Sequence, residues 1–139
     1  MSTALHRGLL VFLAATGGIA GFWAYFAPCH WYNNFPGMGL RWLPPFGPFN
    51  EHFCKDIGAM YLALTLLSVL TIVHITNTTL RRVTGGAWIT FNLLHTAYHV
   101  TMLHMFTARD AMLNVVTLAA VLAASFALLI PVPERVQRS

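Results

Sequence analysis

The segment 57–73, IGAMYLALTLLSVLTIV, carries no charged side chain, and it decides the fold class. A helix needs about 20 predominantly apolar residues to cross the hydrocarbon core of a bilayer. Extended to 55–76, this run is long enough to cross. Three further apolar runs, at about 8–27, 87–107 and 111–131, have a similar length. The sequence therefore predicts an all-α fold, an integral membrane bundle of four transmembrane helices.

The composition of the whole chain also indicates a membrane location. Of the 139 residues, 57% are hydrophobic and only 9% are charged, whereas a soluble domain carries roughly 25% charged residues. The four predicted helices take up most of the chain. We therefore expect a single transmembrane domain, 1–139, without a separate soluble catalytic domain.

The positions of the basic residues predict how the bundle is oriented. Lys and Arg are enriched in the cytoplasmic loops of membrane proteins. Arg7 precedes the first predicted helix, Arg81 and Arg82 separate the second from the third, and Arg135 and Arg138 follow the fourth. We therefore expect a multi-pass protein of the cell (plasma) membrane with both termini in the cytoplasm. The same rule accounts for the net charge of +4, so the lipid bilayer is a predicted partner and nucleic acid is not.

The loop 28–52, between the first two predicted helices, is expected on the outer face. Its Pro and Gly residues forbid a continuous helix, and its Trp and Phe residues are too apolar for a solvated linker. We interpret this aromatic, Pro/Gly-rich outer loop as an ordered lid that lies on the bundle. A protein-binding surface is the alternative, because exposed aromatic side chains mark interfaces.

The two cysteines, Cys29 and Cys54, lie near the two ends of this loop. On the oxidising side of a membrane they could form a disulfide. Closing a loop of that length stabilises a protein by on the order of 3 kcal/mol in the chain-entropy model. Two free buried thiols are the alternative, and the sequence does not choose between them.

The first predicted helix contains three glycines, Gly17, Gly18 and Gly21. Small residues let a neighbouring helix approach closely within a membrane. Gly17 and Gly21 have the Gly-xxx-Gly spacing that is used in helix dimers, but a single match is weak support for dimerisation. We expect these glycines to pack against another helix of the same bundle.

Most of the seven histidines lie in two clusters, at the start of the second predicted helix and near the end of the third. The two helices are antiparallel, and each residue advances about 1.5 Å along a helix. His104 is then level with His52, His99 lies near the depth of Asp56, and His95 is deeper. Ionisable groups at membrane depth are costly and are often functional. The candidate site residues are His52, Asp56, His95 and His99, with Glu51 and His104 as rim members.

Three interpretations of this site are open. Asp56 and His99 could form a buried hydrogen-bonded pair that fixes the geometry of the bundle. The His95-x-x-x-His99 spacing, with His52 and Asp56 opposite, could instead bind a transition metal, namely zinc, copper or iron. The third interpretation is acid–base chemistry on a lipid-soluble substrate, with a desolvated carboxyl group and a histidine sharing a proton.

A pattern of short motifs runs along most of the chain, namely WYNNFPG (31–37), GPFNEH (47–52), DIGA (56–59) and YH (98–99). This pattern resembles that of a group of uncharacterised small four-helix membrane proteins of actinobacteria, which are distantly DoxX-like. The chain departs from the pattern in Trp31 and Phe49, and His104 falls later than the last histidine of the pattern. The resemblance implies a membrane bundle and supplies no reaction.

The function expected from the sequence is that of an accessory or stabilising subunit beside larger membrane proteins. This expectation rests on the short chain, on the small amount of soluble structure and on the lack of a recognised catalytic motif. Other membrane protein subunits are then the expected partners. The alternative is a membrane-embedded metal-dependent or acid–base enzyme that acts on a lipophilic substrate, and the sequence leans away from it.

Overall fold

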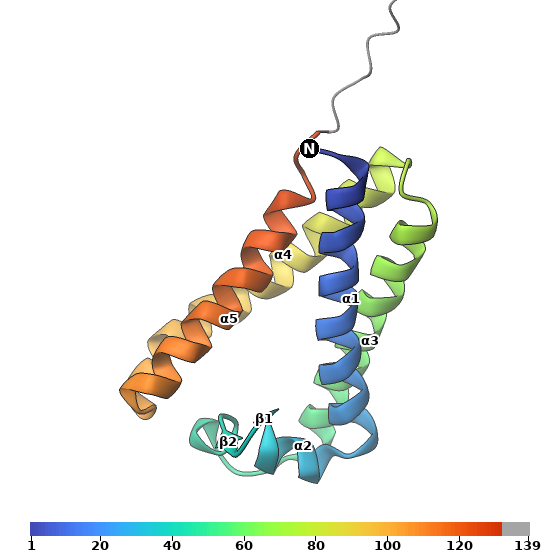
Figure 1. Cartoon of the computed structure of the whole chain (residues 1–139). Coiled ribbons are helices and arrows are strands. Elements are labelled where there is room, and N and C mark those ends of the chain that lie inside the picture. The colour runs from blue at the N-terminus through green and yellow to red at the C-terminus, as the bar shows by residue number, and fades with distance from the viewer. Residues whose placement is uncertain (132–139) are drawn as a thin grey trace, which may run out of the picture.

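The structure, a computed structural model, describes residues 1–131, so the predicted cytoplasmic residues Arg135 and Arg138 lie outside the described part. Its four long helices run up and down, as Figure 1 shows, which confirms the predicted all-α fold. They are α1 (Thr3–Phe26), α3 (Glu51–Val73), α4 (Thr78–Thr101) and α5 (Ala108–Ala127). Three of them, α1, α3 and α5, are long and apolar enough to span a membrane. These apolar helices indicate contact with a lipid bilayer.

Side-chain caps fix where α3 and α5 begin. The Asn50 side chain accepts a hydrogen bond of 3.2 Å from the backbone N–H of Phe53, so α3 begins at Glu51 and not at residue 55. The Thr107 hydroxyl accepts a bond of 3.2 Å from the N–H of Asp110 and caps α5 in the same way. Asn and Thr are favoured at this position because they satisfy N–H groups that the first helical turn leaves free.

The helix α4 differs most from its predicted position, 87–107. The Asn77 side chain accepts a bond of 2.9 Å from the N–H of Leu80, so α4 begins at Thr78 and contains Arg81 and Arg82. The helix ends at Thr101 and is followed by a 3₁₀ turn, η2 (Leu103–Met105). The prediction placed the start of the helix nine residues too late, because the segment 78–86 is too polar to be recognised by hydropathy alone.

The helices α1 and α3 cross at a contact that only glycine permits. A Cβ atom on Gly21 would lie 2.9 Å from the carbonyl oxygen of Gly58, and one on Gly58 would lie 2.7 Å from the backbone nitrogen of Tyr25. A Cβ on Gly17 would lie 2.8 Å from the hydroxyl oxygen of Thr65. The Gly17-xxx-Gly21 spacing therefore serves packing within the bundle, as expected.

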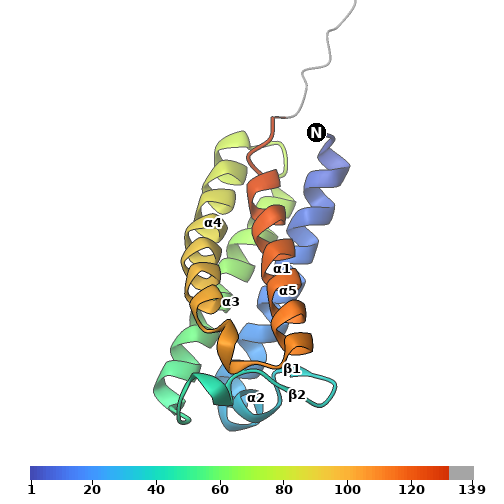
Figure 2. The ribbon, with the colours of Figure 1, turned by 90° about the vertical axis from the view of Figure 1, so that its left-hand side faces the viewer.

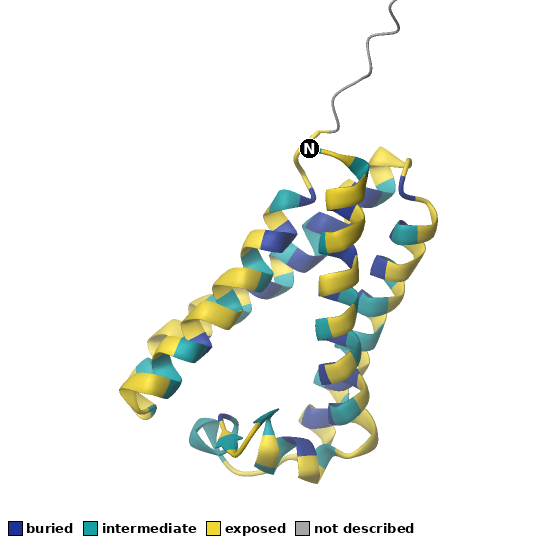
Figure 3. Ribbon diagram, in the orientation of Figure 1, coloured by how far each residue is buried: buried dark blue, intermediate teal, exposed yellow. Residues whose placement is uncertain are grey.

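The two helix pairs, α1 with α3 and α4 with α5, meet at the end where the chain begins and separate toward the other end (Figure 1). Figure 2, turned by 90°, shows α4 and α5 side by side. The core lies where the pairs meet and includes the buried side chains of Leu10, Leu13, Trp88 and Leu128. Figure 3 shows that the far ends of α4 and α5 are mostly exposed.

Residues 28–50 form a small folded unit at the open end of the bundle, and we call this segment the lid. It contains α2 (Pro28–Asn34), the paired strands β1 (Pro36–Gly37) and β2 (Leu40–Arg41), and the 3₁₀ helix η1 (Pro44–Phe46). Trp31 is buried in a cluster with Ala24 of α1 and Cys54 of α3. The Tyr32 hydroxyl donates a hydrogen bond of 2.6 Å to the carbonyl oxygen of Gly47. The lid is therefore packed against the α1–α3 pair, and an internal hydrogen bond joins its first helix, α2, to the turn after η1.

The glycine contact gives a first prediction. We expect the substitution Gly58→Ala to lower the free energy of unfolding by about 1–3 kcal/mol, because the new Cβ meets backbone atoms that cannot move independently. Thermal unfolding of the purified protein in detergent measures this change.

The matched control is Gly86→Ala in α4, where a Cβ would meet nothing within 4 Å. This control should unfold at the wild-type temperature or slightly higher, since Ala favours helix more than Gly does. Equal unfolding temperatures for the two variants would contradict the close α1–α3 contact.

Candidate functional site

The structure does not bring the two predicted histidine clusters together. On α3, His52 Nε2 lies 3.3 Å from Asp56 Oδ2, and these side chains are 80% and 60% exposed. Glu51 and Lys55 form a neighbouring ion pair of 2.8 Å on the same helix. Both pairs are local, four residues apart, and such exposed pairs contribute little to stability. The α3 half of the predicted site is thus a solvated helix surface.

His99 lies between α4 and α5 and has a different partner from the one predicted. Its Nδ1–H donates a hydrogen bond of 3.1 Å to Oδ1 of Asn114 in α5, and the side chain is buried. The buried pair of Asp56 with His99, one of the three interpretations that the sequence left open, is therefore not formed. The physical reason is that α4 follows α5 at this end of the bundle and diverges from α3 (Figure 1).

The lid covers His99 from the open end of the bundle. The ring of Phe46 lies 4.7 Å from the His99 ring between centroids, and it also contacts Tyr98 and Phe106. Because the other end of the lid is buried against α1 and α3, the lid bridges the two separated helix pairs. The aromatic side chain of the lid that contacts the histidine cluster lies against His99.

His95 lies one helical turn below His99 and shares its face, as the spacing predicted. The centroids of the two imidazole rings are 4.3 Å apart, and the His95 ring stacks on Phe91 at 5.2 Å with an interplanar angle of 20°. No hydrogen bond within residues 1–131 involves the His95 imidazole, whereas His99 and His104 each have one. His95 is therefore held by ring contacts and keeps its polar atoms free within the described structure.

The predicted metal set is not assembled in the part of the chain that the structure describes. Within residues 1–131, no group of three or more His, Cys, Asp or Glu side chains is placed to hold a metal ion. His52 with Asp56 and His95 with His99 are two separate pairs on different helices. His104 does not join them, because it is exposed and its Nδ1–H donates a bond of 3.0 Å to the Thr101 carbonyl oxygen.

Both cysteines are free thiols in the structure. Cys29 is exposed in α2, whereas Cys54 is buried in the cluster with Ala24 and Trp31. Of the two alternatives that the sequence left open, the disulfide is not formed. The lid is instead attached to the helices by the packing of its aromatic side chains.

Sequence reasoning missed three residues that the structure places at polar or aromatic contacts. Asn114 is a rare polar residue in an apolar helix, and an amide at that depth is itself a signal that a partner is near. His6 is not among the candidate site residues, but it is fully buried and lies 3.1 Å from the carbonyl oxygens of both Ser2 and Ile130. Phe46 carried no signal, because its contact with His99 depends on the fold of the lid.

The chain was compared with protein-family models, with curated proteins and with solved structures, and none of them matches. The resemblance to small four-helix actinobacterial proteins therefore stays a prediction. The class that the fold itself defines is an all-helical protein with several bilayer-spanning candidates. Its polar site consists of His99 and Asn114, which bond each other between α4 and α5 under an aromatic lid, and of His95, one turn below His99 on α4.

This site gives a second prediction. We expect Asn114→Leu to destabilise the protein by about 1–3 kcal/mol, because it leaves the buried His99 nitrogen without an acceptor. His99→Leu should have a similar effect, and the double variant should cost less than the sum by about 1 kcal/mol. Thermal or denaturant unfolding in detergent measures the three values.

The control for this cycle is Thr117→Val in α5, since the Thr117 hydroxyl is exposed and bonds only carbonyl oxygens of its own helix. It should change the stability little. If the effects of Asn114→Leu and His99→Leu were simply additive, the hydrogen bond between α4 and α5 would not exist in solution.

Proposed function

We propose that α4 also crosses the membrane, so that the chain passes through it four times. Support comes from the polar side chains that lower the hydropathy of this helix, since four of them are paired with α3 or α5 inside the bundle. Polar groups that are paired in this way do not prevent a helix from crossing a bilayer. The pairs are Thr84–Thr71 at 2.6 Å, Trp88–Ser68 at 2.8 Å, Asn92–Ser125 at 3.3 Å and His99–Asn114 at 3.1 Å.

The connections of α4 support the same conclusion. Only residues 74–77 separate it from α3, and only 102–107 separate it from α5. If α3 and α5 cross the membrane, the antiparallel helix between them has to return across it. Arg7, Arg81 and Arg82 lie at the end where α1 begins, so the positive-inside rule places this end in the cytoplasm and the lid outside.

A third prediction tests this topology. In a variant whose Cys29 and Cys54 are replaced by Ala, single cysteines are placed at Thr76 and at Ala108, on either side of α4. A membrane-impermeant maleimide should label Ala108→Cys in intact cells and label Thr76→Cys only after the membrane is permeabilised. Labelling of both positions in intact cells, or of neither, would contradict a membrane-crossing α4.

Within this topology, we propose that the protein acts as an accessory or stabilising subunit of a larger membrane complex. The observation that carries the proposal is the construction of the lid. Met38, at the turn between β1 and β2, is 95% exposed, although it is a large apolar side chain. Methionine is enriched in protein–protein interfaces relative to the rest of the protein surface.

The lid holds Met38 in a fixed position. Arg41 donates hydrogen bonds of 3.1 Å from Nε to the Asn33 carbonyl oxygen and from Nη2 to Asn33 Oδ1, so β2 is tied to α2. Trp42 is buried beneath the strands and packs against Phe35. A surface that is already ordered loses little conformational entropy when a partner binds. The outer segment of a neighbouring membrane protein is therefore the partner that this lid fits best.

A fourth prediction tests this role. Deletion of the gene should lower the amount of one intact membrane complex, and the wild-type protein should restore it and co-purify with it in mild detergent. Met38→Ser should fail to restore the complex, because it removes the apolar contact, while its own unfolding temperature stays unchanged. Native gel electrophoresis and mass spectrometry of the purified complex measure these outcomes.

The matched control is Met112→Ser, which changes an exposed methionine of α5 outside the lid. This variant should restore the complex as the wild type does. A protein that always elutes alone, from membranes whose complexes do not depend on it, would refute the subunit role.

A further inference from the structure

A groove between α3 and α4 opens on the side of the bundle, about halfway along α4. Its volume of about 530 Å³ falls within the range of small-molecule sites, roughly 300–1,000 Å³. The groove is lined by Met60 and Leu64 of α3 and by Ala87, Thr90, Phe91, Leu94 and His95 of α4.

His95 is the one ionisable side chain that lines this groove. The only other polar side chain, Thr90, already donates its hydroxyl to the carbonyl oxygen of Gly86 at 2.9 Å. His95 makes no hydrogen bond within residues 1–131, and its ring is positioned by Phe91 and His99. A neutral imidazole has one N–H donor and one acceptor nitrogen. The groove thus offers one polar contact on an otherwise apolar wall.

Of the α4 side chains without a hydrogen-bond partner, His95 is the one that lines the groove, whereas Arg81 Nε and the Thr96 hydroxyl are also unpaired but buried away from it. Thr84, Trp88, Asn92 and His99 all bond another helix. A polar group that faces hydrocarbon without a hydrogen bond costs free energy, so such groups normally have a partner. Within residues 1–131 no group bonds His95, and the groove is the path by which a partner from outside reaches it.

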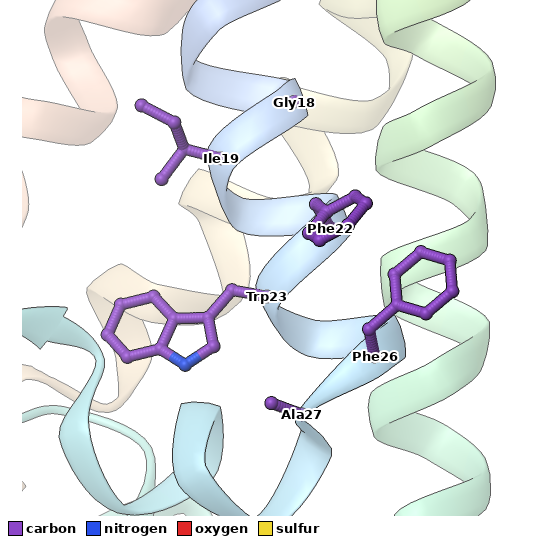
Figure 4. Close-up of a pocket in the computed structure, with 6 residues that line it drawn as sticks. All are labelled: Gly18, Ile19, Phe22, Trp23, Phe26 and Ala27. Carbon is purple, nitrogen blue, oxygen red and sulfur yellow. The ribbon is translucent and has the colours of Figure 1, made fainter.

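A second hollow, on α1, is an apolar surface without an unpaired polar side chain (Figure 4). It measures about 630 Å³ and is lined by Gly18, Ile19, Phe22, Trp23, Phe26 and Ala27. Its one polar atom, Trp23 Nε1, already donates a bond of 2.8 Å to His30 Nδ1. This hollow presents only carbon, and acyl chains of the bilayer are enough to cover it.

We propose that the α3–α4 groove binds a lipid-soluble molecule that carries a hydroxyl or carbonyl group, with His95 as the residue that bonds this group. The volume suits a small molecule and not a transmembrane helix. A phosphate headgroup does not fit, because no Lys or Arg lines the groove. Phe91 and Leu94 supply the apolar wall along which the rest of the molecule lies. The proposal does not depend on the subunit role.

The test uses two photoreactive probes on the full-length protein in lipid nanodiscs. One probe is a long-chain primary alcohol with a diazirine in its chain, and the other is the matching alkane without the hydroxyl. We expect the alcohol to label peptides that contain Met60 or Leu94 about fivefold more than the alkane does, which is the factor expected for one hydrogen bond. Mass spectrometry of the labelled peptides measures it.

Two variants separate the polar contact from the shape of the groove. His95→Phe keeps an aromatic ring that can stack on Phe91 and should abolish the preference for the alcohol. Thr90→Trp fills the groove from an exposed position with His95 intact, and it should abolish labelling by both probes. The control, His104→Phe, changes an exposed histidine outside the groove and should label as the wild type does.

Two outcomes would overturn the proposal. One is equal labelling of the wild type by the alcohol and the alkane, which would show that His95 does not bind the hydroxyl. The other is undiminished labelling of Thr90→Trp, which would place the probe elsewhere. If His95→Phe did not fold, as judged by its unfolding temperature, the comparison of the two probes on the wild type and on Thr90→Trp would still decide the matter.

Discussion

The structure depends on one constraint, which is that polar side chains in an apolar helix bundle need partners inside it. The helix α4 is the least apolar of the four long helices, and it is held by hydrogen bonds to both neighbours. Thr84 and Trp88 bond α3 near the closed end, whereas Asn92 and His99 bond α5 toward the open end. The partners change from one helix to the other along α4. That change lets the α4–α5 pair separate from α3 at the lid.

The α1–α3 pair supplies the rigid part against which this separation occurs. Gly21 and Gly58 let the two backbones meet, and no other residue fits there without displacing backbone atoms. The lid is built on this pair through Trp31 and reaches the other pair through Phe46. Aromatic packing therefore connects the two pairs at the end where the helices themselves do not. The lid thus holds the two helix pairs together, and it also presents Met38 on its outer side.

The separation of the helix pairs also determines what the histidines do. It leaves His52 and Asp56 on an exposed surface, places His99 against Asn114, and leaves His95 at the edge of a groove. The groove and the lid are different surfaces, one at membrane depth and the other outside the proposed membrane boundary. A lipid-soluble ligand and a protein partner can thus bind without competing. The two proposals complement each other, and separate experiments test them.

The sequence by itself determined the helical fold, the three most apolar helices and the use of the α1 glycines, because these depend on local pattern and on helix spacing. The pairing of His95 with His99 was also accessible, since four residues return a helix to the same face. The separation of Asp56 from His99 was not, because equal depth along two helices says nothing about the distance between their axes. Only the tertiary structure decided that α4 follows α5 and not α3 at the lid, since that depends on which buried polar groups satisfy each other.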